Sequence, residues 1–294
     1  MMNSTQVSFF VLGAYIDTKL LKYLWFVILT SLYVLIIICN VLLMVLICVN
    51  RSLHEPMYMF LCSLFVNELY GSTGLFPFLL DQILSDLHTV SVPLCFLQVF
   101  CMHTYGTTEF TTLAVMSYDR YLAICFPLQY SSLMTTATNV CSTTSLSFSL
   151  QLCGNVINKV YCDNYSVVKL ACSDTTVNNI YGLFVTASSV FLAVFFILYT
   201  YMRILRVCYC GSKQTRQKAV STCTPHLASL LNFCCGGFFE IVQSRFDMSR
   251  VPIILRIFLS LYFLTCQPLF NPLMYGLKMS KIRSTCRKLF SFQR

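Results

Sequence analysis

Charged side chains are scarce in this chain of 294 residues: Asp, Glu, Lys and Arg make up only 11% of it, and just 11 residues are acidic. Hydrophobic residues make up 57%, and the mean hydropathy is +0.71. A soluble domain of this composition would expose large apolar patches to water. The shortage of charge therefore excludes an ordinary soluble protein and places the chain in a lipid bilayer.

Metal-binding and catalytic patterns are also missing. The chain has 17 cysteines, but no two have the Cys-x-x-Cys spacing, and no Cys/His set has the spacing of a zinc site. No nucleophile and base stand at a spacing that suggests catalysis. We therefore expect no enzyme, no organic cofactor and no nucleic-acid partner, with most cysteines acting as small apolar packing residues.

Long apolar runs, in contrast, are plentiful. About 20 helical residues cross the hydrocarbon layer. Six runs reach that length, whereas a seventh, between Thr135 and Asn155, is rich in hydroxyl groups and poor in large apolar side chains. The sequence predicts an all-α membrane protein, a seven-transmembrane helix bundle with a shortened, weak fourth helix and a short C-terminal amphipathic helix. The predicted spans are about 24–49, 57–80, 94–125, 136–155, 180–205, 219–242 and 252–276.

The distribution of basic residues favours seven spans and sets their orientation, because Lys and Arg accumulate in cytoplasmic loops. With seven spans and the N-terminus outside, the 20 basic residues divide into 13 inside and 7 outside, and without the fourth span the division is reversed. We therefore predict a plasma-membrane protein with an extracellular N-terminus (1–23), a transmembrane domain (24–276) and a cytoplasmic tail (277–294). The basic inner face suits anionic lipid and an acidic protein partner.

Glycosylation sequons occur on the predicted outer side. Asn3 and Asn164 each begin an Asn-x-Ser/Thr triplet that would lie in the lumen during synthesis. A third triplet, at Asn50, would be cytoplasmic and unmodified. The sequence thus predicts a glycoprotein modified at Asn3 and Asn164.

The most specific motif is MSYDRYLAIC at residues 116–125, the end of the third predicted span. An Asp-Arg pair is too costly to leave unpaired in hydrocarbon, so we expect it at a membrane face. The motif resembles the inner end of helix three in olfactory receptors of the rhodopsin-like G-protein-coupled class. Segments 53–61, 218–227 and 268–275 resemble the same family, in the same order and spacing, and 66–71 resembles its fish-type branch.

The resemblance implies two disulfides on the outer side and a switch on the inner side. The disulfides would be Cys95–Cys162 and Cys153–Cys172, in a lumen oxidising enough to form them. A paired Asp-Arg would hold helices three and six closed until a ligand favours the open arrangement. The residues of this G-protein switch would be Asp119, Arg120, Tyr121, Asn271, Pro272 and Tyr275.

Two carboxylates in predicted spans indicate a functional site independently of the family. Glu68 and Glu109 fall near the middle of the second and third spans, where a carboxylate is costly to bury. The two would share a proton or hold a cation. The resemblance implies a sodium ion here, with Asn40 nearby. Alternatively, both are protonated and hydrogen-bonded to Asn40 or Asn271, or the pair belongs to a proton- or sodium-coupled transporter.

We expect a small-molecule odorant to bind in an outer cavity between helices three, five, six and seven, lined by apolar residues with a few polar handles. The same residues at helical spacing would also suit simple packing. Arg256 would either pair with Glu240 or meet a carboxylate of the ligand. The predicted lining residues are Met102, His103, Gly106, Thr107, Phe238, Tyr262 and Arg256.

Two departures from the family pattern bear on activity. Many olfactory receptors have a tyrosine where Cys234 stands, so that the aromatic switch is missing or moved to Phe233. The fourth span is also about 15 residues shorter than the family pattern between Met134 and Gln151. The predicted function is an odorant receptor that activates a heterotrimeric G protein; the alternatives are a non-functional truncated receptor copy and a transporter using Glu68 and Glu109.

Overall fold

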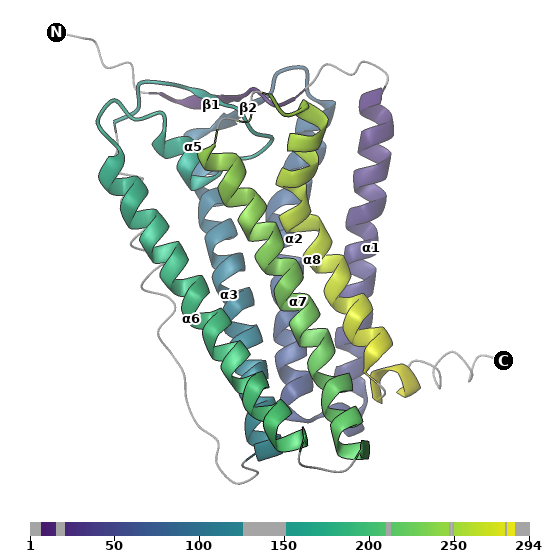
Figure 1. Ribbon diagram of the computed structural model, residues 1–294. Coiled ribbons are helices and arrows are strands. Elements are labelled where there is room, and N and C mark those ends of the chain that lie inside the picture. The colour runs from purple at the N-terminus through teal and green to yellow at the C-terminus, as the bar shows by residue number, and fades with distance from the viewer. Residues whose placement is uncertain are drawn as a thin grey trace.

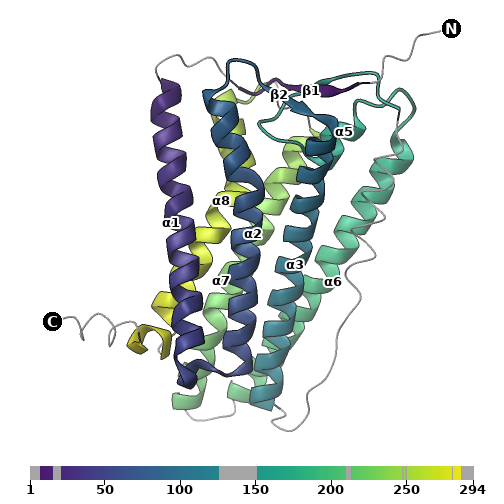
Figure 2. The same ribbon diagram turned by 180° about the vertical axis from the view of Figure 1, so that it is seen from behind.

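The computed structural model describes residues 7–15, 21–125, 151–209, 213–246, 248, 250–279 and 281–285. In this part of the chain, long helices run side by side as a bundle, with α1 at one edge and α6 at the opposite edge (Figure 1 and Figure 2). The long helices are α1 (Leu21–Val49), α2 (Pro56–Leu84), α3 (Val92–Cys125), α6 (Thr176–Tyr209), α7 (Lys213–Arg245) and α8 (Ile253–Lys278).

These helices contain the strongly apolar runs of the sequence. The predicted spans 24–49, 57–80, 94–125, 180–205 and 219–242 each lie within one helix, and 252–276 lies within α8 except for Pro252, which caps it. Most of the predicted fourth span lies outside the described residues. The prediction of helix over 151–155 is wrong, because Leu152 forms an antiparallel bridge with Ala171 there.

Four of the described helices are long and apolar enough to cross a membrane by length and composition: Leu21–Val49, Thr176–Arg206, Cys223–Arg245 and Ile254–Lys278. The helices α2 and α3 are as long but are not among the four, and each carries a glutamate near its middle. Their polar side chains point into the bundle, where Glu68 and Glu109 are fully buried and Asn67 is nearly so. A helix in lipid can keep such residues only where protein covers them.

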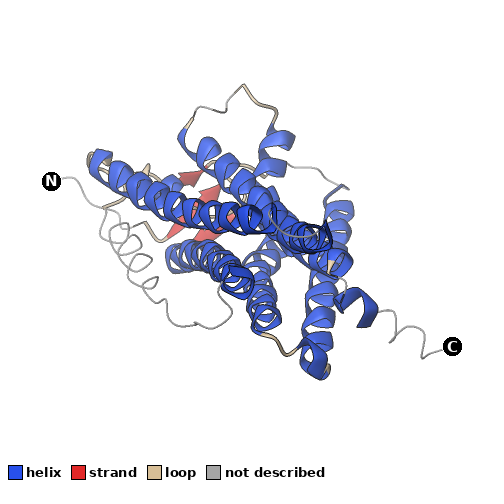
Figure 3. Cartoon of the chain, turned by 60° about the horizontal axis from the view of Figure 1, so that its bottom comes forward, coloured by secondary structure: helices blue, strands red, loops and turns tan. Residues whose placement is uncertain are grey.

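A small sheet closes the end of the bundle at which α1 begins, which we call the outer end following the predicted topology (Figure 1). The strands are β1 (Phe9–Leu12), β2 (Thr89–Ser91) and β3 (Val156–Ile157), in the order β2-β1-β3. Strand β1 is antiparallel to β2 and parallel to β3. Viewed with the inner end turned forward, the strands lie behind the helices (Figure 3).

This sheet was not predicted from the all-α pattern, because its strands are only two to four residues long. It is held by burial: Phe10 and Leu12 of β1 pack against Val90 and the outer turn of α3. The short helix α5 (Asn164–Val168) follows β3 in the same loop, with Asp163 as its N-cap. The N-terminal segment and the long loop therefore form one layer over the outer end.

The inner end holds a second apolar core, in which Tyr275 of α8 packs with Leu61, Phe65 and Met116 from α2 and α3. Residues 281–285 are helical, which agrees with the start of the predicted C-terminal helix. Lys281 pairs there with Glu55, Nζ to Oε1 at 2.5 Å. The remainder of the predicted tail helix, from residue 286, lies outside the described residues, as does Asn3.

Candidate functional site

The last turns of α3 carry the Asp-Arg pair. The Arg120 guanidinium donates to Asp119 Oδ2 through Nη2 at 2.5 Å and through Nε at 3.0 Å. The Asp119 side chain is 7% exposed and that of Arg120 is 18% exposed. Tyr121, next along the helix, is half-buried. Each member of this charge-assisted pair is satisfied by the other, and Arg120 still reaches the surface of the inner end.

The predicted switch residues of α8 lie in two places. Asn271 and Pro272 are buried at mid-bundle, whereas Tyr275 is one turn nearer the inner end. The Tyr275 hydroxyl is 3.2 Å from Nδ1 of His226, a buried residue of α7. This contact joins α8 to α7 just above the Asp-Arg pair.

Glu68 and Glu109 meet in a buried polar cluster at the centre of the bundle. The Asn271 amide donates to Oε1 of both carboxylates, at 3.0 Å for Glu109. Gln267 Nε2 donates to Glu109 Oε1 at 3.1 Å, and the Tyr105 hydroxyl donates to Glu68 Oε2 at 3.0 Å. Helices α2, α3 and α8 are thus joined through side chains that have no access to water.

Asn40 is not part of this cluster, contrary to the prediction. Its Nδ2 donates to the carbonyl oxygens of Ile36 and Pro268, both at 2.9 Å. Pro272 has no N–H to donate to the carbonyl of Pro268 one turn earlier, so that carbonyl is left free to accept from Asn40. The Asn40 side chain instead fastens α1 to the proline-bent part of α8.

The sequence reasoning missed several members of the central cluster: Asn67, Tyr105, Ser229 and Gln267. Asn67 Nδ2 donates to Glu109 Oε2 at 3.1 Å, and the Ser229 hydroxyl donates to Asn271 Oδ1 at 2.6 Å. The sequence does contain one indication of this cluster: Gln267 lies four residues before Asn271 in an apolar run. Polar residues one turn apart in a membrane helix share a face and satisfy each other or a common partner.

Aromatic rings fill the bundle above the central cluster. The Phe233 ring centroid is 4.8 Å from that of Phe110, 5.0 Å from that of Phe263 and 6.0 Å from that of Tyr105. Gly106 borders these rings, and a Cβ at this position would lie in ordinary van der Waals contact, 3.9 Å from both Phe233 and Phe263. Phe233 therefore lies at the centre of a ring cluster in which its neighbour Cys234 has no part.

The predicted pocket residues of α3 border this region. Met102 packs against the ring cluster and also lines a small cavity with Gln98, Cys101 and Tyr161. His103 contacts the carbonyl of Val99 through Nδ1 at 3.0 Å, and the Thr107 hydroxyl donates to the His103 carbonyl at 2.7 Å. These two polar handles are satisfied within α3.

Two predictions on the outer half of α7 and α8 need correction. Phe238 is 62% exposed, because it lies on the side of α7 opposite Phe233 and so points away from the bundle. Arg256 does not pair with Glu240; its Nη2 donates to the carbonyl of Asn158 at 3.3 Å. Tyr262 is half-buried and donates to Asn232 Oδ1 at 2.6 Å.

Both predicted disulfides are present. Cys95 at the start of α3 is bonded to Cys162, and Cys153 to Cys172 within the long loop. The Cys162 backbone N–H donates to Gln98 Oε1 at 3.1 Å, and Gln98 Nε2 is buried without a hydrogen-bond partner. The loop is therefore fixed to the outer end of α3 by one covalent bond and one hydrogen bond.

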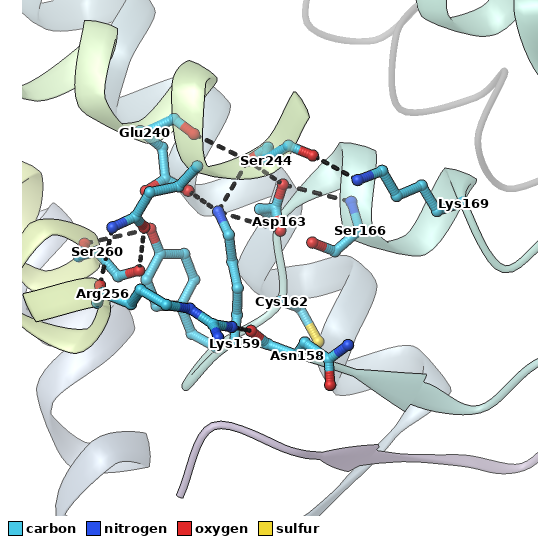
Figure 4. Close-up of polar contacts among 12 residues, drawn as sticks. Asn158, Lys159, Cys162, Asp163, Ser166, Lys169, Glu240, Ser244, Arg256 and Ser260 are labelled. Atoms are coloured by element: carbon cyan, nitrogen blue, oxygen red, sulfur yellow. Dashed lines mark hydrogen bonds and ion pairs between the residues drawn. The ribbon is translucent and has the colours of Figure 1, made fainter. Parts of the chain in front are cut away.

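An ion triad of Lys159, Asp163 and Glu240 joins this loop to α7 (Figure 4). Lys159 Nζ is 2.5 Å from Glu240 Oε1 and 3.5 Å from Asp163 Oδ1, and it donates to the Ser244 hydroxyl at 2.8 Å. Glu240 was noted in the sequence, but its partner was not. The available signal was the Lys-x-x-x-Asp spacing on either side of Cys162.

The loop members of the triad are held in their charged forms. Burial alone would lower the pKa of Lys159, but the attraction of Asp163 and Glu240 outweighs it and leaves that pKa above its ordinary value. Burial would raise the pKa of Asp163, but Lys159 and hydrogen bonds from Ser166 and Ser244 hold it below its ordinary value. Each charge is thus stabilised by the other.

This arrangement predicts a pH window for stability. The contribution of Asp163 is present above the ordinary pKa of about 4 and is lost as pH falls through the lowered pKa in the folded receptor. The contribution of Lys159 is present below about pH 10 and is lost as pH rises through its raised pKa. We expect Asp163→Asn to destabilise the detergent-solubilised receptor by about 3 kcal/mol near pH 7. In thermal unfolding, the difference from wild type should shrink below pH 4.

The matched control for this experiment is Asp86→Asn. Asp86 also pairs with a lysine at the outer end, Lys22 at 3.0 Å, but its side chain is 93% exposed. An exposed pair contributes little. An Asp163→Asn receptor as stable as the Asp86→Asn receptor at pH 7 would show that the buried triad contributes no stability.

Comparison with known proteins agrees with the resemblance of the motifs. The family model described as olfactory receptor matches residues 29–293. Olfactory receptor 51G1 of Homo sapiens is 35% identical over 277 residues, which cover 89% of this chain and 86% of that receptor. Olfactory receptor 11A1 of Homo sapiens is 34% identical over 303 residues, with 98% and 95% covered.

The fold is that of a rhodopsin-like receptor. The crystal structure of squid rhodopsin matches with a TM-score of 0.67, covering 92% of this chain and 81% of that chain at 17% sequence identity. The assignment to a fish-type branch stays a prediction. Since the family model and relatives more than 30% identical match nearly the whole length, the chain belongs to the olfactory receptor family, whose members are multi-pass membrane receptors and not enzymes.

Proposed function

We propose that this receptor binds a small-molecule odorant in the outer half of the bundle and activates a heterotrimeric G protein at its inner end. Tyr105 is the observation that carries this proposal. Its ring lies 5.8 Å from that of Phe263 and 6.0 Å from that of Phe233, and its hydroxyl donates to Glu68 Oε2. One side chain therefore connects the region expected to hold the ligand with the central polar cluster.

The route from ligand to G protein follows the buried contacts inward. A ligand among the rings shifts Phe233 and hence α7, and it stabilises whichever arrangement of helices it binds more tightly. The cluster around Asn271 passes this change to α8, and the contact between Tyr275 and His226 passes it towards Arg120. Each step requires only that the helices involved change from one packed arrangement of side chains to another.

The expected ligand is neutral and mostly apolar with one hydrogen-bond acceptor. The ring cluster offers apolar surface, and the handles on His103 and Thr107 are already satisfied. Gln98 Nε2 is buried, lines the small cavity and lacks a partner. A carbonyl or hydroxyl oxygen of the ligand would satisfy this donor. The cavity is smaller than an ordinary ligand site, so binding requires the rings to move.

The test is a panel of small neutral aldehydes, ketones and alcohols, with G-protein nucleotide exchange measured in membranes that display the receptor. At least one compound should increase exchange, and Gln98→Met should weaken its potency about 10-fold because the donor is lost. Thr104→Val serves as control, since Thr104 bonds the Phe100 carbonyl and Tyr70 and is not among the residues that line the cavity. A receptor retained inside the cell and silent to every compound would favour the non-functional copy.

A sodium ion between Glu68 and Glu109 is the second part of the proposal. The donors there are oxygens, which a hard cation prefers, and Ser72 Oγ is buried one turn from Glu68 without a partner. The residues present therefore fit the ion. Glu68, Glu109 and Ser72 would hold it, and its charge would replace the proton that two adjacent buried carboxylates otherwise need.

Sodium should favour the resting arrangement, because the ion holds α2 and α3 together. We expect odorant potency to fall several-fold when sodium replaces an impermeant organic cation in the buffer, and the fall to vanish in Glu109→Gln. Ion flux through the membrane distinguishes the transporter. Sodium-driven flux that is lost in Glu68→Gln but unaffected in Arg120→Ala would contradict a receptor and support transport.

A further inference from the structure

The outer ion triad connects α3 and α7, two helices that contact each other little. Lys159 and Asp163 belong to the loop before α6, and Glu240 belongs to α7 (Figure 4). Cys162 lies between the two loop residues and is bonded to Cys95 at the start of α3. The triad therefore ties the outer end of α7 to the outer end of α3 through a few residues of loop.

Further contacts surround the triad. Lys169 Nζ donates to the Ser244 carbonyl at 2.7 Å, and the Arg245 guanidinium lies 4.2 Å from the Tyr165 ring centroid. The side chains of Lys159, Asp163 and Glu240 are 8%, 14% and 15% exposed. Separating α7 from the loop would pull apart charges that are almost entirely out of water, so the contact holds until all of it is broken.

The triad is nevertheless incompletely balanced. It has two carboxylates and one ammonium group, although Lys169 also acts on Asp163 and Tyr161 contacts Glu240, and among the described residues Glu240 Oε2 is buried without a partner within hydrogen-bond distance. The Ser244 hydroxyl accepts from Lys159 and lies 3.1 Å from Asp163 Oδ2 and 2.9 Å from the Glu240 carbonyl, although it has one proton to donate. A buried group left without a partner raises the free energy of the closed state. The buried ion pairs hold α7 against the loop. The unsatisfied polar atoms among them lower the free energy needed to separate α7 from the loop.

We propose that Lys159, Asp163 and Glu240 form an outer lock, which holds α7 against the loop in the resting receptor and opens when α7 moves during activation. α7 runs from Lys213 to Arg245 with Pro225 inside it, so its inner end can bend at that proline, whereas a tilt of the segment from Pro225 to Arg245, which carries Phe233, displaces its outer end. The lock deepens the proposed function, because activation is taken to move α7 relative to α3. The lock restrains the loop whether or not an odorant is bound.

Hydrogen exchange of the purified full-length receptor tests the restraint. The backbone amides of the loop from 158 to 170 and of the last turns of α7 should exchange at least 10-fold faster in Glu240→Gln and in Lys159→Met. The charge swap Lys159→Glu with Glu240→Lys should return exchange towards the wild-type rate, because the ion pair is rebuilt with its polarity reversed. Asp86→Asn, which breaks the exposed pair with Lys22, should have no effect on these amides.

Nucleotide exchange without odorant tests the coupling to activation. Basal exchange should rise about five-fold in Glu240→Gln and fall back in the charge swap. Hydrogen exchange that is unchanged in both Glu240→Gln and Lys159→Met would overturn the lock. Exchange in the charge swap that is as fast as in these two single variants would also overturn it. Faster hydrogen exchange with unchanged basal signalling, in a receptor that does respond to an odorant, would overturn its role in activation. Failure of the proposed function would instead appear as a wild-type receptor that activates no G protein while the hydrogen-exchange differences persist.

Discussion

The Arg120→Ala receptor should reach the cell surface and bind odorant but lose odorant-stimulated nucleotide exchange by about 100-fold. Arg120 is the guanidinium at the inner end of α3, bonded twice to Asp119 and still partly exposed. Under the proposed function, its donors would exchange Asp119 for carbonyl or carboxylate groups of the G protein. Alanine removes these donors and leaves the fold of the outer half unchanged.

Two companion variants make this result specific. Asp119→Asn removes the charge that holds Arg120, so basal nucleotide exchange should rise rather than fall. Arg51→Ala removes another exposed arginine at the inner end, in the short helix Arg51–Leu53, and should keep most of the signal. If Arg120→Ala signalled as well as Arg51→Ala does, Arg120 would not be the residue that couples α3 to the G protein.

The second large effect is expected for Cys95→Ala, which should remove most of the folded receptor from the cell surface. The Cys95–Cys162 bond closes a segment of 67 residues, and chain entropy assigns such a closure about 4 kcal/mol. The bond also fixes the loop that carries Lys159 and Asp163, so its loss weakens the contact with α7. Surface labelling of intact cells and thermal unfolding in detergent measure the two consequences.

Cysteine variants within the same receptor provide the controls. Cys153→Ala opens a closure of only 19 residues and should cost about 3 kcal/mol, less than Cys95→Ala. Cys101→Ala lies on α3 like Cys95 but removes a free, half-buried thiol, so its effect should stay near 1 kcal/mol. Equal surface levels for Cys95→Ala and Cys101→Ala would show that the disulfide does not stabilise the fold.

Helix positions could be predicted well because they depend on local composition. The apolar runs define α1, α6, α7 and α8, and Pro252 marks the start of α8 within one residue. The motif at 116–125 placed Asp119 and Arg120 at the end of α3, where the structure has them paired. The burial cost of a carboxylate drew attention to Glu68 and Glu109, which the structure places in one buried polar cluster, while their role as a cation site stays a prediction.

The sequence by itself determined that this is a multi-helix membrane protein, which residues carry charge into the bundle and which family it resembles. Only the tertiary structure decided the partners: Asn271 and Gln267 rather than Asn40 for the central carboxylates, and Lys159 rather than Arg256 for Glu240. It also turned Phe238 away from the bundle and placed β1 in a sheet over it. The physical reason is that hydropathy sets where a helix lies along the chain. Its rotation, and the loop that covers it, depend on contacts between residues far apart in sequence, such as Lys159 and Glu240 at 81 positions and Asn40 and Pro268 at 228.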